Sequence, residues 1–287
     1  MKARAFTYVR AHSLEEAVSC FSEADGEASY ISGGQSLVPA LALRLQAPAV
    51  LIDLAGITTL RGVMLEDGAL RIGALTRHAD MLTHPLIAAH APLLREAAPH
   101  VAHPAIRNRG TIGGNIALAD PASEFPAMLL AMDARVEIFG PAGFRQVPAD
   151  DYFLDLYQTA VEPGEIVTAI LVPPAPAGTL IAMDELARRR GDYAMVGAGL
   201  QGRLSAEGNV EALRIAFFSV GATPVRAKGA EGALIGSMLD ATAIANAQRA
   251  LDEDLDPMDD EEVPAAMRRH LARVLLGRLL QRMRDKS

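Results

Sequence analysis

Two Gly-Gly pairs with polar flanks constrain this chain more than any other feature of its sequence. They lie in Ser32-Gly33-Gly34-Gln35-Ser36 and in Thr111-Ile112-Gly113-Gly114-Asn115. Glycines allow positive φ and close backbone approach, so that consecutive N–H groups can point at one anion. The hydroxyl groups in both segments add donors to phosphate oxygens. A single Gly-Gly pair is most often a tight turn, but two with similar flanks predict a cradle for a diphosphate.

The pattern around the first segment places it between a strand and a helix. Ser13 and Glu16 form a capping box at the start of an N-terminal helix. Apolar runs predict strands at 28–31 and 50–52, with a helix at 37–45 between them. The start of that helix would add partial positive charge beside the glycines. The chain therefore opens with a compact strand–loop–helix–strand unit that ends near residue 57.

The second segment falls in what the sequence predicts to be a long loop, residues 104–121. A hairpin with its turn at Asp67-Gly68 and a helix at 77–82 capped by Thr76 precede it. Strands at 136–139 and 166–172 follow it. The second glycine pair is thus expected in irregular structure.

A proline-rich stretch, Pro173-Pro174 and Pro176 followed by Gly178, is the clearest linker. It divides the chain into a first domain, 1–175, with subdomains of about 1–57 and 58–175, and a second domain, 176–287. In the second domain we expect strands near 194–199 and 213–220 and terminal helices at 241–251 and 264–284. A chain of 287 residues has room for two domains.

Composition excludes several kinds of protein. The single cysteine, Cys20, excludes an internal disulfide and an iron–sulfur or zinc site built from this chain's own thiolates. A net charge of −8 argues against nucleic acid, which requires clustered basic charge. There is no run of roughly 18 apolar residues for a membrane span and no apolar stretch behind the first residues for a secretory signal. We expect a cytoplasmic protein.

Three other patterns are given structural interpretations. Residues 197–202 match G-x-G-x-x-G, but 203–209 looks like a hairpin turn and not like the helix that a dinucleotide site needs. The histidines at 78, 84, 90, 100 and 103 lack a metal-binding pattern and are expected at the surface or at helix ends. The arginines of the last helix are expected on a solvated face, with partner docking as the second alternative.

Longer stretches of the chain, in order, resemble the FAD-binding medium subunits of the molybdenum hydroxylases, the family of carbon monoxide and xanthine dehydrogenases. The matching stretches are 31–39 with Leu43-Arg44-Leu45 and Leu51-Ile52-Asp53, then 106–117 with Asp120-Pro121, then 188–194 and Gly221-Ala222-Thr223-Pro224-Val225-Arg226. Many relatives have His where this chain has Gln35, and several have Lys where it has Asp184-Glu185.

The resemblance implies an α+β fold: a two-subdomain FAD-binding domain of the vanillyl-alcohol-oxidase-like type, followed by a smaller α/β C-terminal domain. It implies that both glycine segments wrap the FAD diphosphate, that Asp120 contacts the ribose–ribityl region, and that Tyr193 lies against the flavin ring. It implies no metal ligand and no catalytic residue in this chain. The implied FAD-binding residues are Ser32, Gly33, Gly34, Gln35, Ser36, Thr111, Ile112, Gly113, Gly114, Asn115, Asp120 and Tyr193.

The implied function is electron transfer within a multi-subunit oxidoreductase. The FAD of this chain would pass electrons from two [2Fe–2S] clusters in a small partner subunit to an external acceptor. A large partner would hold the molybdenum cofactor, and the unit would be a heterotrimer doubled into a dimer. Two alternatives remain open at this point: a self-sufficient FAD-dependent oxidase or dehydrogenase, and a structural subunit that no longer holds FAD.

Overall fold

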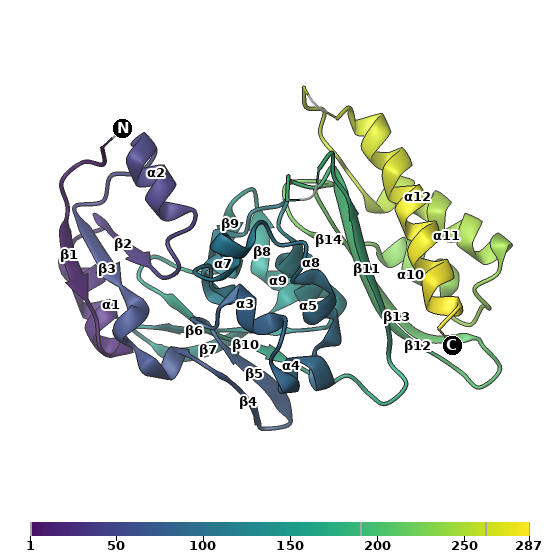
Figure 1. Ribbon diagram of the computed structural model, residues 1–287, viewed down its shortest axis with the longest axis horizontal. Helices are drawn as coiled ribbons and strands as arrows, with labels where there is room; N and C mark the ends of the chain where they lie inside the picture. Colours follow the sequence, from purple (N-terminus) through teal and green to yellow (C-terminus); the bar gives the residue numbers. More distant parts are fainter. Residues whose placement is uncertain (1, 190, 262, 287) are drawn as a thin grey trace.

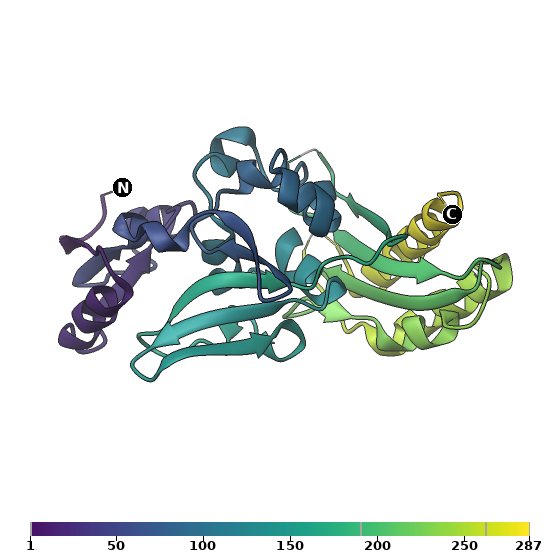
Figure 2. The same cartoon turned by 90° about the horizontal axis from the view of Figure 1, so that it is seen from below.

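The chain builds three larger β-sheets that lie in a row along the long axis of the molecule (Figure 1). The computed structural model describes residues 2–189, 191–261 and 263–286. From below, the middle sheet lies between the N-terminal unit and the C-terminal sheet (Figure 2). The architecture is mixed α and β, as the sequence predicts.

The N-terminal unit is a parallel sheet of order β1-β3-β2. Helix α1 begins after Ser13, whose side chain accepts from the N–H of Glu16 at 3.0 Å. The Glu16 carboxylate accepts from the N–H of His12 and not from that of Ser13, so the capping box is displaced by one residue. The elements are β1 (Thr7–Arg10), α1 (Leu14–Glu23), β2 (Ala28–Ile31), α2 (Leu37–Leu43) and β3 (Val50–Asp53), followed by 3-10 turns at Leu54–Gly56 and Thr58–Leu60.

This unit places the first glycine segment at the carboxyl end of β2, directly before α2. Open α/β sheets bind ligands outside the carboxyl ends of their parallel strands, because the loops to the following helices gather there. The predicted strand–loop–helix–strand order is confirmed, and it places the segment Ser32–Ser36 at the carboxyl end of β2.

The middle unit is an antiparallel sheet of order β4-β5-β10-β6-β7 with short helices packed on it. The hairpin with its turn at Asp67-Gly68 is confirmed. The strands are β4 (Val63–Glu66), β5 (Ala69–Gly73), β6 (Arg135–Gly140), β7 (Gly143–Pro148) and β10 (Ile166–Val172), with a separate hairpin of β8 (Phe153–Asp155) and β9 (Gln158–Thr159). The helices are α3 (His78–Met81), α4 (Pro85–His90), α5 (Pro92–Ala97), α6 (Pro104–Arg107), α7 (Ile112–Leu118), α8 (Glu124–Ala131) and α9 (Ala149–Tyr152).

Two expectations for this unit are wrong. Residues 104–121 do not form a long loop, because α6 starts at Pro104 and α7 holds the second glycine pair in its first turn. Two adjacent glycines have low helix propensity and hide this helix in the sequence. Thr76 does not cap a helix: its hydroxyl donates to the carbonyl of Gly62 at 3.1 Å, and Arg77 takes the N-cap position of α3.

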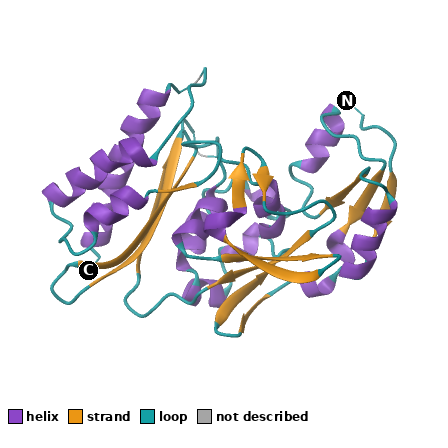
Figure 3. Ribbon diagram, turned by 180° about the vertical axis from the view of Figure 1, so that it is seen from behind, coloured by secondary structure: helices purple, strands orange, loops and turns teal. Residues whose placement is uncertain are grey.

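The C-terminal unit is a sheet of order β11-β12-β13-β14 covered on both faces (Figure 3). Helices α10 and α12 pack on one face together with α11, while α5 and α8 of the middle unit pack on the other. The elements are β11 (Leu180–Leu186), β12 (Val196–Leu204), β13 (Val210–Phe218), β14 (Val225–Arg226), α10 (Lys228–Leu234), α11 (Ala241–Asp254) and α12 (Ala265–Arg284).

The G-x-G-x-x-G match lies inside β12, and the predicted hairpin turn follows it between β12 and β13. Its glycines serve packing. A Cβ on Gly199 would collide with the Met128 side chain of α8, and one on Gly202 would lie 2.5 Å from the carbonyl oxygen of Ala212. The motif lets a helix of the middle unit approach the C-terminal sheet.

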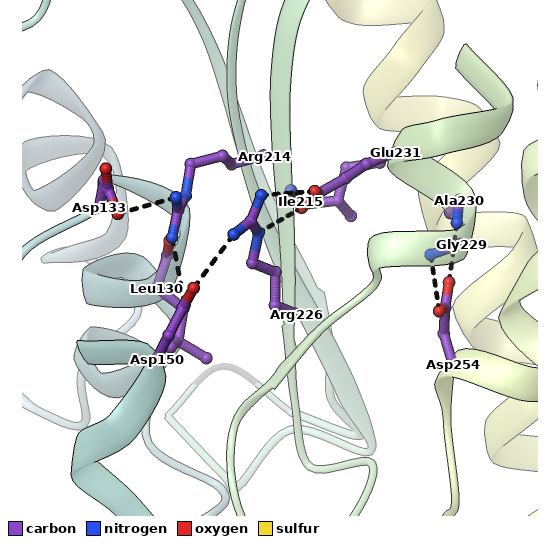
Figure 4. A network of polar contacts seen from close by, with 10 residues as sticks. All are labelled: Leu130, Asp133, Asp150, Arg214, Ile215, Arg226, Gly229, Ala230, Glu231 and Asp254. Atoms are coloured by element: carbon purple, nitrogen blue, oxygen red, sulfur yellow. Dashed lines mark hydrogen bonds and ion pairs between the residues drawn. The ribbon is translucent and has the colours of Figure 1, made fainter. Parts of the chain in front are cut away.

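A polar network fixes the C-terminal unit to the middle unit (Figure 4). Asp150 of α9 forms ion pairs of 3.1 Å with both Arg214 and Arg226. Arg226 also forms a two-bond pair with Glu231, which is 6% exposed and accepts a third hydrogen bond from the N–H of Ile215. The bidentate pair with Glu231 orients the Arg226 side chain within the C-terminal unit. Asp150 links the two units through its ion pairs with Arg214 and Arg226.

Candidate cofactor cavity

One cavity of about 680 Å³ collects residues from all three units. Its size falls within the range of roughly 300–1,000 Å³ that small-molecule sites occupy. The cavity is lined by the first glycine segment, by α7 and the turn before α8, and by the stretch 191–193. All of the predicted FAD-binding residues line this cavity except Ile112.

The first segment leaves its backbone donors free. Among the described residues, no protein acceptor takes the N–H of Gly33, Gly34, Gln35 or Ser36. Gly34 has φ +72, a conformation that favours glycine, and Ser36 is in the right-handed helical region. Successive free N–H groups in such a turn form an anion-binding concavity. The side chain of Gln35 donates to the carbonyl of Gly33 at 3.1 Å and thereby braces the turn.

The backbone N–H groups of the second segment donate hydrogen bonds to acceptors within the protein. The N–H of Ile112 donates to the carbonyl of Thr76 at 3.0 Å, and that of Gly113 donates to the carbonyl of Ala74 at 2.8 Å. The N–H of Gly114 donates to the hydroxyl of Thr111, which caps α7. The N–H of Asn115 donates to the carbonyl of Thr111 at 3.0 Å. This segment therefore contributes little free backbone polarity to a ligand.

Ile112 points away from the cavity. Its side chain is 0% exposed and belongs to the core of the middle unit. With its N–H bonded to Thr76 as well, its contribution is to anchor α7 beneath the sheet.

The two segments touch although 79 positions separate their hydroxyl residues. Thr111 donates its hydroxyl proton to Ser32 Oγ at 3.1 Å, while its oxygen accepts from the N–H of Gly114. Ser32 then keeps its own proton for an acceptor in the cavity. A Cβ on Gly33 would lie 2.8 Å from Gly110 Cα, so this glycine is needed for contact between the segments.

Asn115 carries an unpartnered acceptor into the cavity. Its amide nitrogen donates to Ser123 Oγ at 2.6 Å, which orients the side chain. Its Oδ1 atom is buried and has no hydrogen-bond partner among the described residues. A buried acceptor without a partner costs about 1–3 kcal/mol. A ligand that offers a hydroxyl or N–H here would remove that cost.

Asp120 and Tyr193 meet at the end of the cavity. The Tyr193 hydroxyl donates to Asp120 Oδ2 at 3.2 Å, and Asp120 Oδ1 accepts from the N–H of Ala122 at 3.0 Å. Surrounding protein and the nearby carboxylate raise the pKa of Tyr193 to about 12. The phenol therefore stays neutral near pH 7 and is a poor base. Its side chain is 74% exposed and leaves an aromatic face open to a ligand.

The residues present fit FAD. The free N–H groups of the first segment and the spare proton of Ser32 match a diphosphate. The acceptors Asn115 Oδ1 and Asp120 match the hydroxyl groups of its sugar chains, and Tyr193 offers a ring face for an aromatic system. Together, these donors and acceptors match the phosphate and hydroxyl groups of a dinucleotide such as FAD.

Sequence reasoning missed two features of the cavity. Gly191 has φ +91, and a Cβ there would lie 2.9 Å from His103 Nδ1, so this glycine fixes the approach to Tyr193. His78 lies at the start of α3, one of the two positions expected for these histidines, but it lines the cavity and is only 5% exposed. The alternation of apolar residues around 70–75 was the available signal that the following turn is buried. Arg190, part of the stretch that carries the resemblance, lies outside the described residues.

Comparison with known families shows the family to which this chain belongs. Residues 4–175 match the family model of the FAD binding domain in molybdopterin dehydrogenase, and residues 181–283 match that of the CO dehydrogenase flavoprotein C-terminal domain. The chain belongs to the FAD-binding medium subunits of the molybdenum hydroxylases. The medium-subunit resemblance, the fold class and FAD as the cofactor of this chain are thereby confirmed.

Individual medium subunits align over nearly the full length. The 6-hydroxypseudooxynicotine dehydrogenase complex subunit alpha of Paenarthrobacter nicotinovorans is 39% identical over 98% of this chain and 95% of its own. The carbon monoxide dehydrogenase medium chain of Hydrogenophaga pseudoflava is 36% identical over 96% of both chains. This medium subunit is thus part of an FAD-dependent oxidoreductase.

Solved structures agree with the sequence comparison. Carbon monoxide dehydrogenase from Hydrogenophaga pseudoflava superposes with a TM-score of 0.96 at 38% identity, covering 99% of this chain and 98% of that one. Quinoline 2-oxidoreductase from Pseudomonas putida 86 gives 0.94 at 35% identity, covering 100% and 99%. In the parts of this medium subunit that the structure describes, no helix has the length and apolar character needed to cross a membrane.

Proposed function

We propose that this chain holds one noncovalent FAD in the cavity and relays electrons through it from iron–sulfur clusters of a small partner subunit to an external acceptor. The observation that carries the proposal is the convergence, in one cavity, of four free backbone N–H groups, the Ser32 hydroxyl, the Asn115 acceptor and the open face of Tyr193. FAD, when bound, accepts an electron pair and releases single electrons.

The roles of the protein groups follow from their positions. The first segment binds the diphosphate through its N–H groups, and Ser32 donates to a phosphate oxygen. Asn115 and Asp120 accept from hydroxyl groups along the sugar chains and so orient the cofactor. Tyr193 lies against the flavin ring and excludes water from that face. Since its pKa is raised, it performs no proton abstraction near neutral pH.

The assembly we propose is a heterotrimer with an iron–sulfur small subunit and a large subunit that holds the molybdenum cofactor, doubled into a dimer in the cytoplasm. The relatives named above as medium chains or complex subunits support a multi-subunit enzyme. Which compound is hydroxylated is decided in the large subunit. Purification of the natively expressed complex, with mass identification of its chains, tests the composition.

The test of the function uses the same preparation. The purified complex should show a flavin spectrum that a reducing substrate bleaches, and the chain separated from its partners should keep FAD but lose this bleaching. Acid precipitation should release the flavin into the supernatant, since neither segment holds a Cys or His to form a covalent bond. A separated chain that the substrate still reduces at the full rate contradicts electron relay. Flavin that stays with the precipitate contradicts noncovalent binding.

A further inference from the structure

His78 is a buried histidine whose two ring nitrogens both lack partners. Its side chain is 5% exposed, and neither Nδ1 nor Nε2 has a hydrogen-bond partner among the described residues. Buried polar groups are nearly always paired, and leaving one unpaired costs about 1–3 kcal/mol. His78 lines the cofactor cavity, where a bound ligand could supply a partner.

Packing holds the ring in place on the sides away from the cavity. The ring of Phe125 meets it edge to face, with centroids 5.2 Å apart. Gly110 lies so close that a Cβ there would be 3.1 Å from Cε1 and Nδ1 of the imidazole. The backbone N–H of His78 donates to the carbonyl of Gly110 at 3.0 Å. The residue is thus fixed against the turn that leads into Thr111.

The imidazole is neutral at physiological pH. Burial lowers the pKa of His78 to about 4; the backbone of Thr111 opposes this shift, without a hydrogen bond of standard geometry, and Arg107 adds to it. A neutral imidazole has one N–H donor and one acceptor nitrogen. It offers a hydrogen bond to an uncharged or anionic ligand without bringing a positive charge into the cavity.

A second unpartnered atom lies in the same cavity, Oδ1 of Asn115. His78 begins α3 and Asn115 lies in α7, and both line the cavity together with the first glycine segment. Two unpartnered polar groups outside the first segment indicate a ligand that carries polar atoms beyond the diphosphate. The sugar and ring portions of FAD supply such atoms.

We propose that His78 is an FAD-binding residue outside both glycine segments, and that its neutral imidazole forms a hydrogen bond with the bound cofactor. This inference rests on the proposed function. His84 provides a matched control, because its Nδ1 is also buried without a partner among the described residues, yet His84 does not line the cavity.

The test uses full-length variants that are stripped of FAD and titrated with it. His78→Leu should raise the Kd for FAD about tenfold, or 1.4 kcal/mol. It should leave the Tm of the FAD-free protein unchanged or higher, since it removes two unpaired polar atoms. His78→Gln, which keeps a donor and an acceptor, should bind FAD within about threefold of the unaltered chain. His84→Leu should bind FAD normally.

The opposite pattern would overturn the inference. The proposed hydrogen bond to FAD is contradicted if the Kd of His78→Leu lies within twofold of that of the unaltered chain. It is also contradicted if His84→Leu or His78→Gln loses as much affinity for FAD as His78→Leu does. Weaker binding that comes with a lower Tm of the FAD-free protein contradicts it as well, because that marks a structural histidine. If the unaltered chain binds no FAD at all, the proposed function fails first, and the two failures are thereby distinguished.

Discussion

The two glycine segments look alike in sequence and do different work in the structure. The first, Ser32–Ser36, leaves four successive N–H groups without a protein acceptor among the described residues. The second, Thr111–Asn115, donates inward to Thr76, Ala74 and Thr111 and starts a helix. The first segment has the free N–H groups that anion binding requires, which supports the proposed diphosphate contact, whereas the second joins α7 to the middle sheet and positions one side chain, Asn115. Similar glycine pairs therefore do not imply similar ligand contacts.

The largest expected effect comes from Gly113. A Cβ there would lie 2.8 Å from both Cα and O of Ala74, which are backbone atoms that cannot move aside. We expect Gly113→Val to cost about 3 kcal/mol of stability, the upper end of the usual cost of overpacking a buried site, and to lower the flavin content of the purified protein. Thermal unfolding of the FAD-free chain measures this. Gly232→Ala is the control, because Gly232 lies in helix α10 with no atom within 4 Å of the added Cβ. A Gly113→Val variant with an unchanged Tm would contradict the structural role of Gly113.

Substitution of Gly114 should weaken FAD binding without changing the fold. A Cβ there meets only side-chain oxygens, Ser32 Oγ at 2.6 Å and Thr111 Oγ1 at 3.0 Å. Its φ is not positive, so the reason is steric and not conformational. We expect Gly114→Val to lose FAD, because Ser32 is pushed into the diphosphate site, while the fold stays native. Visible absorbance together with far-ultraviolet circular dichroism checks both parts. A variant that retains its full flavin content contradicts the expected contact.

Acid should lower the folding stability of the FAD-free protein through protonation of His78. An imidazole with a lower pKa in the folded chain takes up its proton first in the unfolded chain, so stability is lost as pH falls. From about 6.5 towards the value of about 4 for His78, we expect a loss of up to about 3 kcal/mol in the FAD-free protein. Glu124, whose pKa burial raises to about 7, contributes the opposite slope. The difference between the unaltered chain and His78→Leu in denaturant unfolding at pH 7 and pH 5 isolates the histidine. Parallel slopes would show that His78 is not buried as a neutral group.

The smallest effects should come from the two linked hydroxyl groups. Thr111→Val removes the N-cap of α7 and should cost about 1 kcal/mol of stability. Ser32→Ala removes a donor to the cavity and should weaken FAD binding by a factor of about five to ten, with a smaller loss of stability than Thr111→Val because Thr111 still caps α7. Measuring Tm and Kd for both variants gives a two-way comparison. If Ser32→Ala destabilises the fold as much as Thr111→Val, the two segments do not differ in role.

The sequence predicted the position of the first segment between a strand and a helix, and it predicted the family. It failed to predict features that depend on contacts between residues far apart in the chain. The apolar runs at 28–31 and 50–52 and the turn at Asp67-Gly68 follow local patterns and are confirmed. Helix α7 could not be predicted, because its glycines are required by contacts with Ala74 and with Ser32, far away in the chain. For the same reason the sequence could not show that the N–H groups of the second segment are already used. The buried position of His78 depends on Phe125 and Gly110, which no local pattern connects to it.

Amide hydrogen exchange with and without FAD tests the difference between the two segments most directly. In the FAD-free chain, peptides that cover residues 33–36 should exchange rapidly because their N–H groups have no acceptor, and FAD should slow them by about tenfold or more. Peptides that cover 112–115 should exchange slowly in both states, since their bonds are internal. Protection of 33–36 before FAD is added, or FAD-dependent protection confined to 112–115, would contradict the assignment of the diphosphate to the first segment.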